Sequence, residues 1–163
     1  MPIDVVWGTG SARTELGAFD AALSDANVHN YNLVELSSIV PEGAAVERVG
    51  ALEPGRWATG DLVAVVLASR TSSTPGDRVA AGLGWALAEE GGVFVENDAP
   101  SAGACEHLLE ANLADARSIR DWGWTSGGER QVVEGVVDDA GAGAAVVAAV
   151  FHPISAGRRD DDR

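Results

Sequence analysis

The sequence predicts an α+β domain in which two helices cover the faces of a mostly antiparallel sheet. Several short segments alternate apolar residues or hold them in continuous runs, and two longer segments repeat them at helical spacing. The chain has 163 residues, the length of one domain, and 46% hydrophobic residues, which excludes a disordered chain. We therefore assign residues 1–156 to a single domain and expect the charged tail, 157–163, to be disordered.

The first 25 residues predict a strand followed by a helix. Apolar residues alternate along 3–7, and the run Gly-Thr-Gly-Ser at 8–11 indicates a turn. Thr14 fits the N-cap of the helix that follows. The apolar face of this helix should hold Leu16, Phe19 and Leu23.

The next segments predict strands joined by a long loop. Residues 31–40 have strand composition and end at a proline, and 42–60 are expected to form a loop. The continuous apolar run 61–69 indicates a buried strand. In 79–87 large and small residues alternate, and we favour a strand because each glycine in a helix would cost about 1 kcal/mol.

Residues 92–97 predict another short strand, with Phe94 and Glu96 on the same face. A helix is expected over 101–121, and two more strands over 132–137 and 142–151. The apolar stripe of the helix should hold Ala104, Leu108, Ala111 and residues 116–119.

The charge balance restricts the partners of the chain. Asp and Glu number 25 against 11 basic residues, all of them Arg, for a net charge of -14. Such a surface repels a phosphate backbone, so we expect no nucleic-acid partner. Carboxylates spread along the whole chain are typical of a salt-adapted protein, although an acidic protein from dilute surroundings has the same pattern. No apolar run reaches the roughly 18 residues of a membrane span, and we expect a cytoplasmic protein.

Cysteine and histidine give no sign of a metal site. Cys105 is the single cysteine and cannot form an intramolecular disulfide. His29, His107 and His152 lack the paired spacing of zinc ligands, so surface or capping roles are favoured.

Ser37 and Ser38 stand at the end of a strand and allow two interpretations. Their hydroxyls can satisfy the hydrogen bonds of a turn. Alternatively, a serine hydroxyl held against the preceding carbonyl in a strained backbone can attack it and convert the amide to an ester. Elimination from that ester would break the chain.

The run 32–41, Asn-Leu-Val-Glu-Leu-Ser-Ser-Ile-Val-Pro, resembles the processing motif of pyruvoyl-dependent arginine decarboxylases. Residues 14–23 are similar to the first helix of that family. The stretch from Pro75-Gly-Asp77 to Gly92-Val-Phe-Val-Glu96 is similar to the one that ends in its catalytic glutamate. Together these segments extend the resemblance over residues 8–151.

The resemblance implies a proenzyme that cleaves itself between Ser37 and Ser38. The products would be a β chain, 1–37, and an α chain, 38–156 with the tail, whose first residue is a covalent pyruvoyl group made from Ser38. This group would form a Schiff base with L-arginine and accept the electrons released with CO2, yielding agmatine for polyamine synthesis. Neither a metal nor pyridoxal phosphate is implied.

The resemblance also assigns roles to particular residues. Glu96 is the proton donor, Asn32 orients the scissile peptide or the substrate, and Asp20 faces the guanidinium group. A carboxyl beside Phe94 would be desolvated, which raises its pKa, but Glu96 also fits an exposed strand end, as Asn32 fits a turn and Asp20 a helix surface. The pocket would be lined by Leu16, Ile39, His29 and Tyr31.

By the same resemblance, the layers are helix, sheet, sheet and helix, a four-layer α/β/β/α sandwich. The chains would form a homotrimer or a dimer of trimers with active sites at subunit interfaces. Two alternatives stay open. The bulky His29 and Tyr31 suit a pyruvoyl decarboxylase of another amino acid, and an uncleaved chain would be a non-catalytic oligomer or regulatory partner.

Overall fold

The computed structural model describes residues 2–154 and confirms the α+β class. The strands form a five-stranded sheet in the order β2-β5-β9-β1-β4 and a four-stranded sheet in the order β3-β7-β6-β8. The elements are β1 (Ile3–Ala12), α1 (Glu15–Asp25), β2 (Asn32–Glu35), β3 (Ile39–Val40), β4 (Val46–Gly50), β5 (Leu62–Ser72), β6 (Arg78–Ala88), β7 (Gly91–Ala99), α2 (Ala102–Ser118), β8 (Glu129–Val136) and β9 (Ala142–Pro153).

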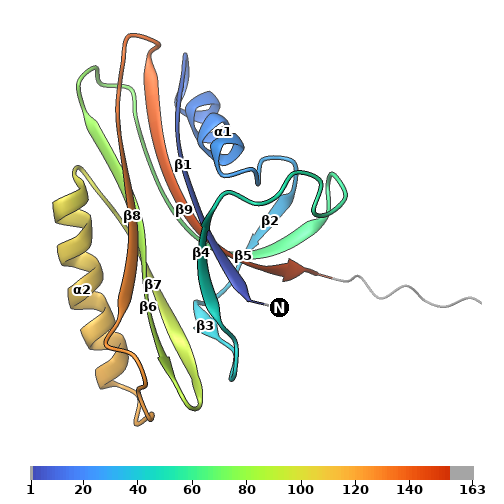
Figure 1. Cartoon of the computed structure of the whole chain (residues 1–163). Helices are drawn as coiled ribbons and strands as arrows, with labels where there is room; N and C mark the ends of the chain where they lie inside the picture. Colours follow the sequence, from blue (N-terminus) through green and yellow to red (C-terminus); the bar gives the residue numbers. More distant parts are fainter. Residues whose placement is uncertain (1, 155–163) are drawn as a thin grey trace, which may run out of the picture.

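Both sheets are mostly antiparallel, and each has a helix on its outer face (Figure 1). Only the pairs β1–β4 and β2–β5 are parallel among the strands described. The main apolar cluster joins the inner faces of the two sheets, a second joins α1 to the five-stranded sheet, and two smaller ones join α2 to the four-stranded sheet. This packing follows the order helix, sheet, sheet, helix that the resemblance implies.

The first strand is longer than the sequence predicted, and the turn expected at 8–11 does not exist. β1 continues through Gly8 and Gly10 and pairs with β9 as far as Ala12. The glycines are needed because α1 lies directly on the strand: a Cβ added to Gly10 would lie 2.4 Å from the carbonyl oxygen of Ala18. Glycine here marks a close approach of two backbones rather than a change of direction.

Both helices begin where the sequence predicted, but their buried faces agree only in part with the expected ones. In α1, Leu23 is buried and Phe19 packs against the same apolar cluster, as predicted. The Thr14 hydroxyl accepts a hydrogen bond from the Gly17 N–H, and Ser101 caps α2 in the same way. Leu16 is 77% exposed, because small residues face the glycines of β1. The buried residues are Ala18, Ala22 and Leu23 in α1, and Cys105, Leu109 and Leu113 in α2.

The stripe predicted for α2 is therefore displaced by about one residue from the buried one. Cys105, Leu109 and Leu113 recur every four residues, whereas Leu108 and Ile119 are exposed. Alanine fits either face of a helix, so the alanines of α2 did not identify its buried side.

The predicted strand over 31–40 is divided between the two sheets. β2 pairs with β5 in one sheet, and β3 pairs with β7 in the other. The predicted loop over 42–60 contains the edge strand β4, which pairs in parallel with β1. Its mostly exposed, polar sequence lacks the apolar alternation that identifies a half-buried strand. The strands predicted over 61–69, 79–87, 92–97, 132–137 and 142–151 are confirmed as β5 to β9.

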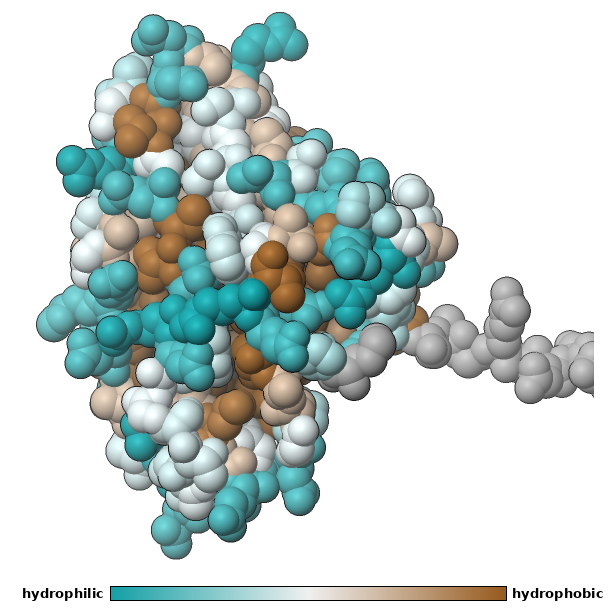
Figure 2. Space-filling model, in the orientation of Figure 1, coloured by the Kyte–Doolittle hydropathy of each residue, from teal (hydrophilic) through white to brown (hydrophobic). Residues whose placement is uncertain are grey.

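Hydrophilic side chains cover much of the face seen in Figure 2, and apolar ones form separate patches between them. Neither helix in the described part of the chain is long and apolar enough to cross a membrane. The tail predicted to be disordered, 157–163, lies outside the described residues.

Candidate functional site

The segment from Leu36 to Ile39 links the two sheets. The Leu36 N–H donates to the carbonyl oxygen of Val65 in the five-stranded sheet, at 2.8 Å. The Ser38 carbonyl accepts a hydrogen bond from the Phe94 N–H in the four-stranded sheet, also at 2.8 Å. The Ser37–Ser38 peptide bond is therefore held from both ends, once by each sheet.

Ser38 has a strained backbone conformation. Its φ of +67° lies in the left-handed region, which among the described residues only Asn27 and several glycines share. An L-residue with a Cβ pays about 1–2 kcal/mol for this conformation, and asparagine tolerates it better than serine. The fixed ends of the link keep Ser38 in this state.

The Ser38 hydroxyl contacts the carboxylate of Glu96, which lies 58 residues away in the sequence. The distances from Ser38 Oγ to the two carboxylate oxygens are 3.0 and 2.9 Å. Phe94, two residues before Glu96 on β7, packs between Trp85 and Phe151 with centroid distances of 6.1 Å to each. This aromatic contact fixes β7, so the next inward-facing side chain reaches the link.

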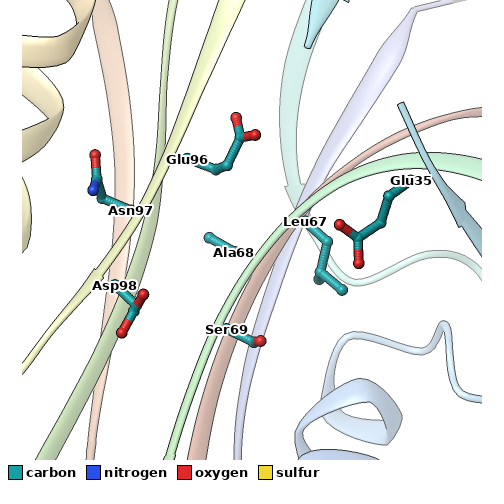
Figure 3. A pocket seen from close by; sticks show the side chains of 7 residues that line it. All are labelled: Glu35, Leu67, Ala68, Ser69, Glu96, Asn97 and Asp98. Atoms are coloured by element: carbon teal, nitrogen blue, oxygen red, sulfur yellow. The ribbon is translucent and has the colours of Figure 1, made fainter. Parts of the chain in front are cut away.

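A small cavity of about 210 Å³ adjoins this contact, where β5 and β7 separate (Figure 3). Glu35 from β2 and Glu96 from β7 lie on opposite sides of it. On its wall Asp98 pairs with Arg70 at 2.8 Å. The sequence carries no local signal for Glu35, Ser69 or Asp98 as lining residues, because only the tertiary fold brings β2, β5 and β7 together here.

Glu96 is exposed in the single chain. The strand itself therefore does not bury the carboxyl group, contrary to the desolvation that we expected from its position beside Phe94. Any desolvation of Glu96 must come from a substrate or from another chain.

Asn32 lies at the start of the strand that leads to the serines. Its side-chain amide donates to the carbonyl oxygen of Gly60 at 2.8 Å, and its backbone N–H donates to that of Asp61 at 2.9 Å. These contacts fix its position next to the loop that joins β4 to β5.

The other predicted site residues do not line the cavity of one chain. Asp20 and Leu16 lie on the exposed side of α1, and Ile39 follows Ser38 with 45% of its surface exposed. Tyr31 turns toward Trp57, whose backbone N–H donates to the Tyr31 hydroxyl at 3.4 Å. His29 has a buried Nδ1 with no hydrogen-bond partner. One chain therefore brings together Ser38 and Glu96 but not the residues expected to bind the substrate.

Potential metal ligands are dispersed over the described residues, and the single cysteine is buried. Within residues 2–154, no three His, Cys, Asp or Glu side chains lie close enough to hold a metal ion. Burial, together with the nearby charges of Asp98 and Glu106, raises the pKa of the Cys105 thiol to about 11. Cys105 therefore stays protonated near neutral pH and is a weak nucleophile.

The arrangement suits an attack by the Ser38 hydroxyl on its own chain. The group has a carboxylate beside it to accept the proton, and the backbone is strained at that residue. A carboxyl group at the edge of a cavity can later return a proton to a bound molecule.

Comparisons with known proteins agree with this chemistry. The model of the family described as pyruvoyl-dependent arginine decarboxylase matches residues 2–156. A protein of that name from Halobacterium salinarum is 38% identical over 147 residues, which cover 89% of each chain. One from Pyrococcus abyssi is 35% identical over 67% of this chain and 69% of its own. One from Methanothermobacter thermautotrophicus is 33% identical over 60% and 61%, respectively.

Proposed function

This chain belongs to the pyruvoyl-dependent arginine decarboxylase family, and we propose that it cleaves itself between Ser37 and Ser38 and then decarboxylates L-arginine to agmatine. The family match supports the reaction. The observation that carries the assignment to these residues is the contact of the Ser38 hydroxyl with Glu96 at a strained backbone position.

Self-cleavage begins when Ser38 Oγ attacks the carbonyl carbon of Ser37. Glu96 accepts the hydroxyl proton, the C–N bond breaks, and an ester to Ser37 and a free amine on Ser38 result. Loss of the Ser38 α-proton then breaks the bond from Cβ to the ester oxygen and releases the Ser37 carboxylate. Water converts the remaining dehydroalanine to the pyruvoyl group and releases ammonia, so that atoms balance.

The local structure favours the first of these steps. Breaking the Ser37–Ser38 amide allows Ser38 to leave its left-handed conformation, so the stored strain is relieved as the reaction proceeds. The Phe94 N–H holds the Ser38 carbonyl during the attack.

The same carboxyl group then serves the decarboxylation. The pyruvoyl group supplies the electron sink for the electron pair that CO2 leaves behind. Ser38 fits as its precursor, because its side chain lies at Glu96 beside the cavity. A protonated Glu96 is placed to deliver its proton to the α-carbon of the substrate.

Substrate recognition in this proposal needs a second chain. Asp20, Leu16 and Ile39 are exposed, and a neighbouring subunit can bring Asp20 to the site as the partner of a guanidinium group. A homotrimer, or a dimer of trimers, with sites between subunits accounts for this exposure. Burial in such an interface would also desolvate Glu96.

We further expect His29 and Tyr31 to influence the substrate only through the position of neighbouring residues, since Tyr31 turns toward Trp57. The expected cellular role is the supply of agmatine for polyamine synthesis in the cytoplasm. The acidic surface suits concentrated salt, which screens the repulsion between its carboxylates.

The test is the mass of the denatured protein after purification in concentrated KCl, before and after borohydride reduction with arginine. We expect two chains, residues 1–37 and a pyruvoyl-capped chain from 38 onward, and an arginine-derived adduct on the larger chain only. A single intact chain that persists in high salt would refute the proposal. Release of CO2 from another amino acid but not from arginine would refute the substrate.

Two serine variants form a matched pair for this test. Ser38→Ala lacks the nucleophile and should remain one chain. Ser37→Ala keeps the carbonyl that is attacked and should still yield two chains. Cleavage of Ser38→Ala would exclude Ser38 as the nucleophile.

A further inference from the structure

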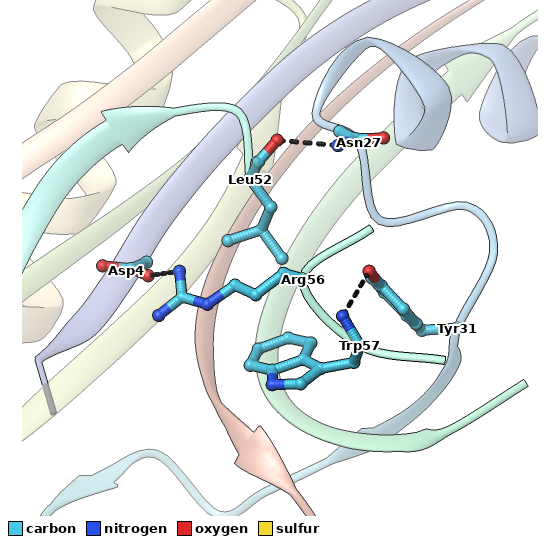
Figure 4. A network of polar contacts seen from close by, with 6 residues as sticks. All are labelled: Asp4, Asn27, Tyr31, Leu52, Arg56 and Trp57. Atoms are coloured by element: carbon cyan, nitrogen blue, oxygen red, sulfur yellow. Dashed lines mark hydrogen bonds and ion pairs between the residues drawn. The ribbon is translucent and has the colours of Figure 1, made fainter. Parts of the chain in front are cut away.

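The loop between β4 and β5, residues 51–61, is tied to β1 by a partly buried ion pair. Its Arg56 pairs with Asp4 on β1 (Figure 4). We propose that Arg56 is a positioning residue for self-cleavage: it fixes this loop, and the loop fixes Asn32 at the start of the strand that presents Ser37 to Ser38. This inference rests on the proposed self-cleavage.

The buried carboxylate of Asp4 requires a counter-charge, which Arg56 supplies. Within residues 2–154 Asp4 is the one buried charged side chain, with 5% of its surface exposed, and it lies near the start of β1, between the neighbouring strands β9 and β4. A charge buried there is tolerated only when it is paired, so Arg56 is held in place. The loop is thereby joined to β1, one of the best buried strands.

Arg56 contacts Trp57, and Trp57 in turn contacts Tyr31. The guanidinium group of Arg56 lies 5.1 Å from the centroid of the Trp57 ring. The Trp57 and Tyr31 rings meet edge to face with their centroids 5.5 Å apart, and the backbone N–H of Trp57 donates to the Tyr31 hydroxyl. Figure 4 shows these side chains in sequence between β1 and the segment before β2.

The end of the loop forms hydrogen bonds with the segment from Asn30 to Asn32. The Gly60 N–H donates to the Asn30 carbonyl at 2.8 Å, and the Asn32 N–H donates to the Asp61 carbonyl. The Asn32 side chain donates to the Gly60 carbonyl at 2.8 Å. Asn32 is therefore held through both its backbone and its side chain.

The position of Asn32 sets that of the scissile bond. β2 runs in parallel with β5 from Asn32 to Glu35, and Leu36 adds one more hydrogen bond to β5. Because β2 is one short extended strand, a displacement at Asn32 carries along it to the Ser37 carbonyl. Ser38 is held separately by β7, so such a shift changes the approach of its hydroxyl.

Arg48 provides a matched control. It also pairs with a carboxylate, Glu129 at 2.9 Å, and also lies over a tryptophan, Trp85 at 4.7 Å. Its hydrogen bonds lead to β8 and not to the segment before Ser38. If every cluster of arginine, carboxylate and tryptophan were simply needed for a stable fold, replacing either arginine would slow self-cleavage equally.

The experiment follows cleavage of the full chain after refolding into concentrated KCl, by mass, with circular dichroism recording the folded fraction. We expect Arg56→Gln to cleave about ten- to a hundredfold more slowly per folded molecule, since small misplacements have effects of this size. Arg48→Gln should cleave at the wild-type rate. Added hydroxylamine, which splits an ester, should not restore the rate of Arg56→Gln, because the attack that forms the ester is the impaired step.

Each contrary result is distinct. If folded Arg56→Gln cleaves as fast as the wild type, or Arg48→Gln is slowed equally, Arg56 has only a structural role. Rescue by hydroxylamine would place the defect after the attack and overturn the proposal. If the wild type does not cleave at all, the proposed function itself fails.

Arg56→Lys covers the case in which Arg56→Gln does not fold. Lysine keeps a positive charge beside Asp4, so the chain should fold, but its ammonium group cannot pair with Asp4 and also lie flat on Trp57. We expect cleavage several-fold slower than in the wild type. A wild-type rate for the folded lysine variant would overturn the proposal.

Discussion

The link between the two sheets and the contact between α1 and β1 are both tight, yet they are built from different residues. Where α1 packs on β1, residues 8 and 10 are glycines, because backbone atoms of the helix occupy the space that a Cβ would need. At the link, Ser38 adopts a conformation that favours glycine, and its hydroxyl contacts Glu96. Glycine occurs where only space is required, whereas the strained position keeps a serine, whose hydroxyl the proposed self-cleavage would require.

The largest effect should come from removing the acid at the link. Glu96→Gln keeps the size of the side chain but cannot deliver a proton, and we expect at least about a hundredfold slower CO2 release from arginine. The rate is measured per cleaved chain, so that a slower self-cleavage does not enter it. Asp98→Asn, the next inward-facing carboxylate on β7, is the control and should lose little activity, since Asp98 is paired with Arg70. Equal losses in the two variants would contradict a specific role of Glu96.

At the contact between α1 and β1, Gly10→Val should destabilise the fold by about 3 kcal/mol through overpacking. Its Cβ would meet backbone atoms of α1, which cannot move aside as a side chain can. Urea denaturation in a constant salt concentration measures the free energy of unfolding. Gly103→Ala in α2 is the control: nothing lies within 4 Å of its Cβ, and alanine should stabilise the helix slightly. A stable Gly10→Val variant would contradict the packing argument.

The stability of the contact between α2 and its sheet should depend on pH through Cys105. The pKa of the buried Cys105 thiol is raised from 9.0 to about 11. Below pH 9 both the folded and unfolded chains hold the proton, so the shift has no effect. Between pH 9 and 11 only the unfolded chain releases it, and the free energy of unfolding should fall by about 2 kcal/mol.

Cys105→Ala isolates this effect from other groups that titrate in the same range. The difference in unfolding free energy between the wild type and the variant should shrink by the same amount from pH 9 to pH 11. A difference that stays constant would show that Cys105 is not protonated more strongly in the folded chain.

The smallest effect should come from the strain itself. Ser38→Gly and Ser38→Ala both lack the hydroxyl and should remain uncleaved, so their stabilities can be compared directly. Glycine adopts a φ of +67° without a Cβ clash, and we expect the glycine variant to be more stable by about 1 kcal/mol. Equal stabilities in urea denaturation would mean that Ser38 stores no strain.

Most strands and both helices could be predicted from the sequence, because long apolar runs and capping residues are local signals. The strand β4 could not be predicted, since Val46–Gly50 is a polar edge strand stabilised by pairing with β1 rather than by burial. The turn predicted at Gly8 and Gly10 was wrong for a related reason: only α1, a tertiary neighbour, explains these glycines.

The candidate site shows the same division. Ser38 and Glu96 were identified through a resemblance to a family, and the fold brings them together across 58 residues. Asp4 carried a local signal, a charge between apolar neighbours on a buried strand, but its partner Arg56 lay in a predicted loop. The positions of Asp20 and Leu16 relative to Ser38 stay predictions, because they depend on a second chain.

The strand order of the five-stranded sheet has a consequence for the folding reaction. β1 lies between β9 and β4, and β2 pairs with β5, so cleavage after Ser37 would place neighbouring strands on different molecules. Folding of the uncleaved precursor is unimolecular, whereas refolding of the cleaved protein requires two chains to meet. At the same oligomeric state, the midpoint of unfolding should then depend more strongly on protein concentration in the cleaved enzyme than in uncleaved Ser38→Ala. Self-cleavage would thus turn a reversible fold into an assembly that is made once, before the chain is cut.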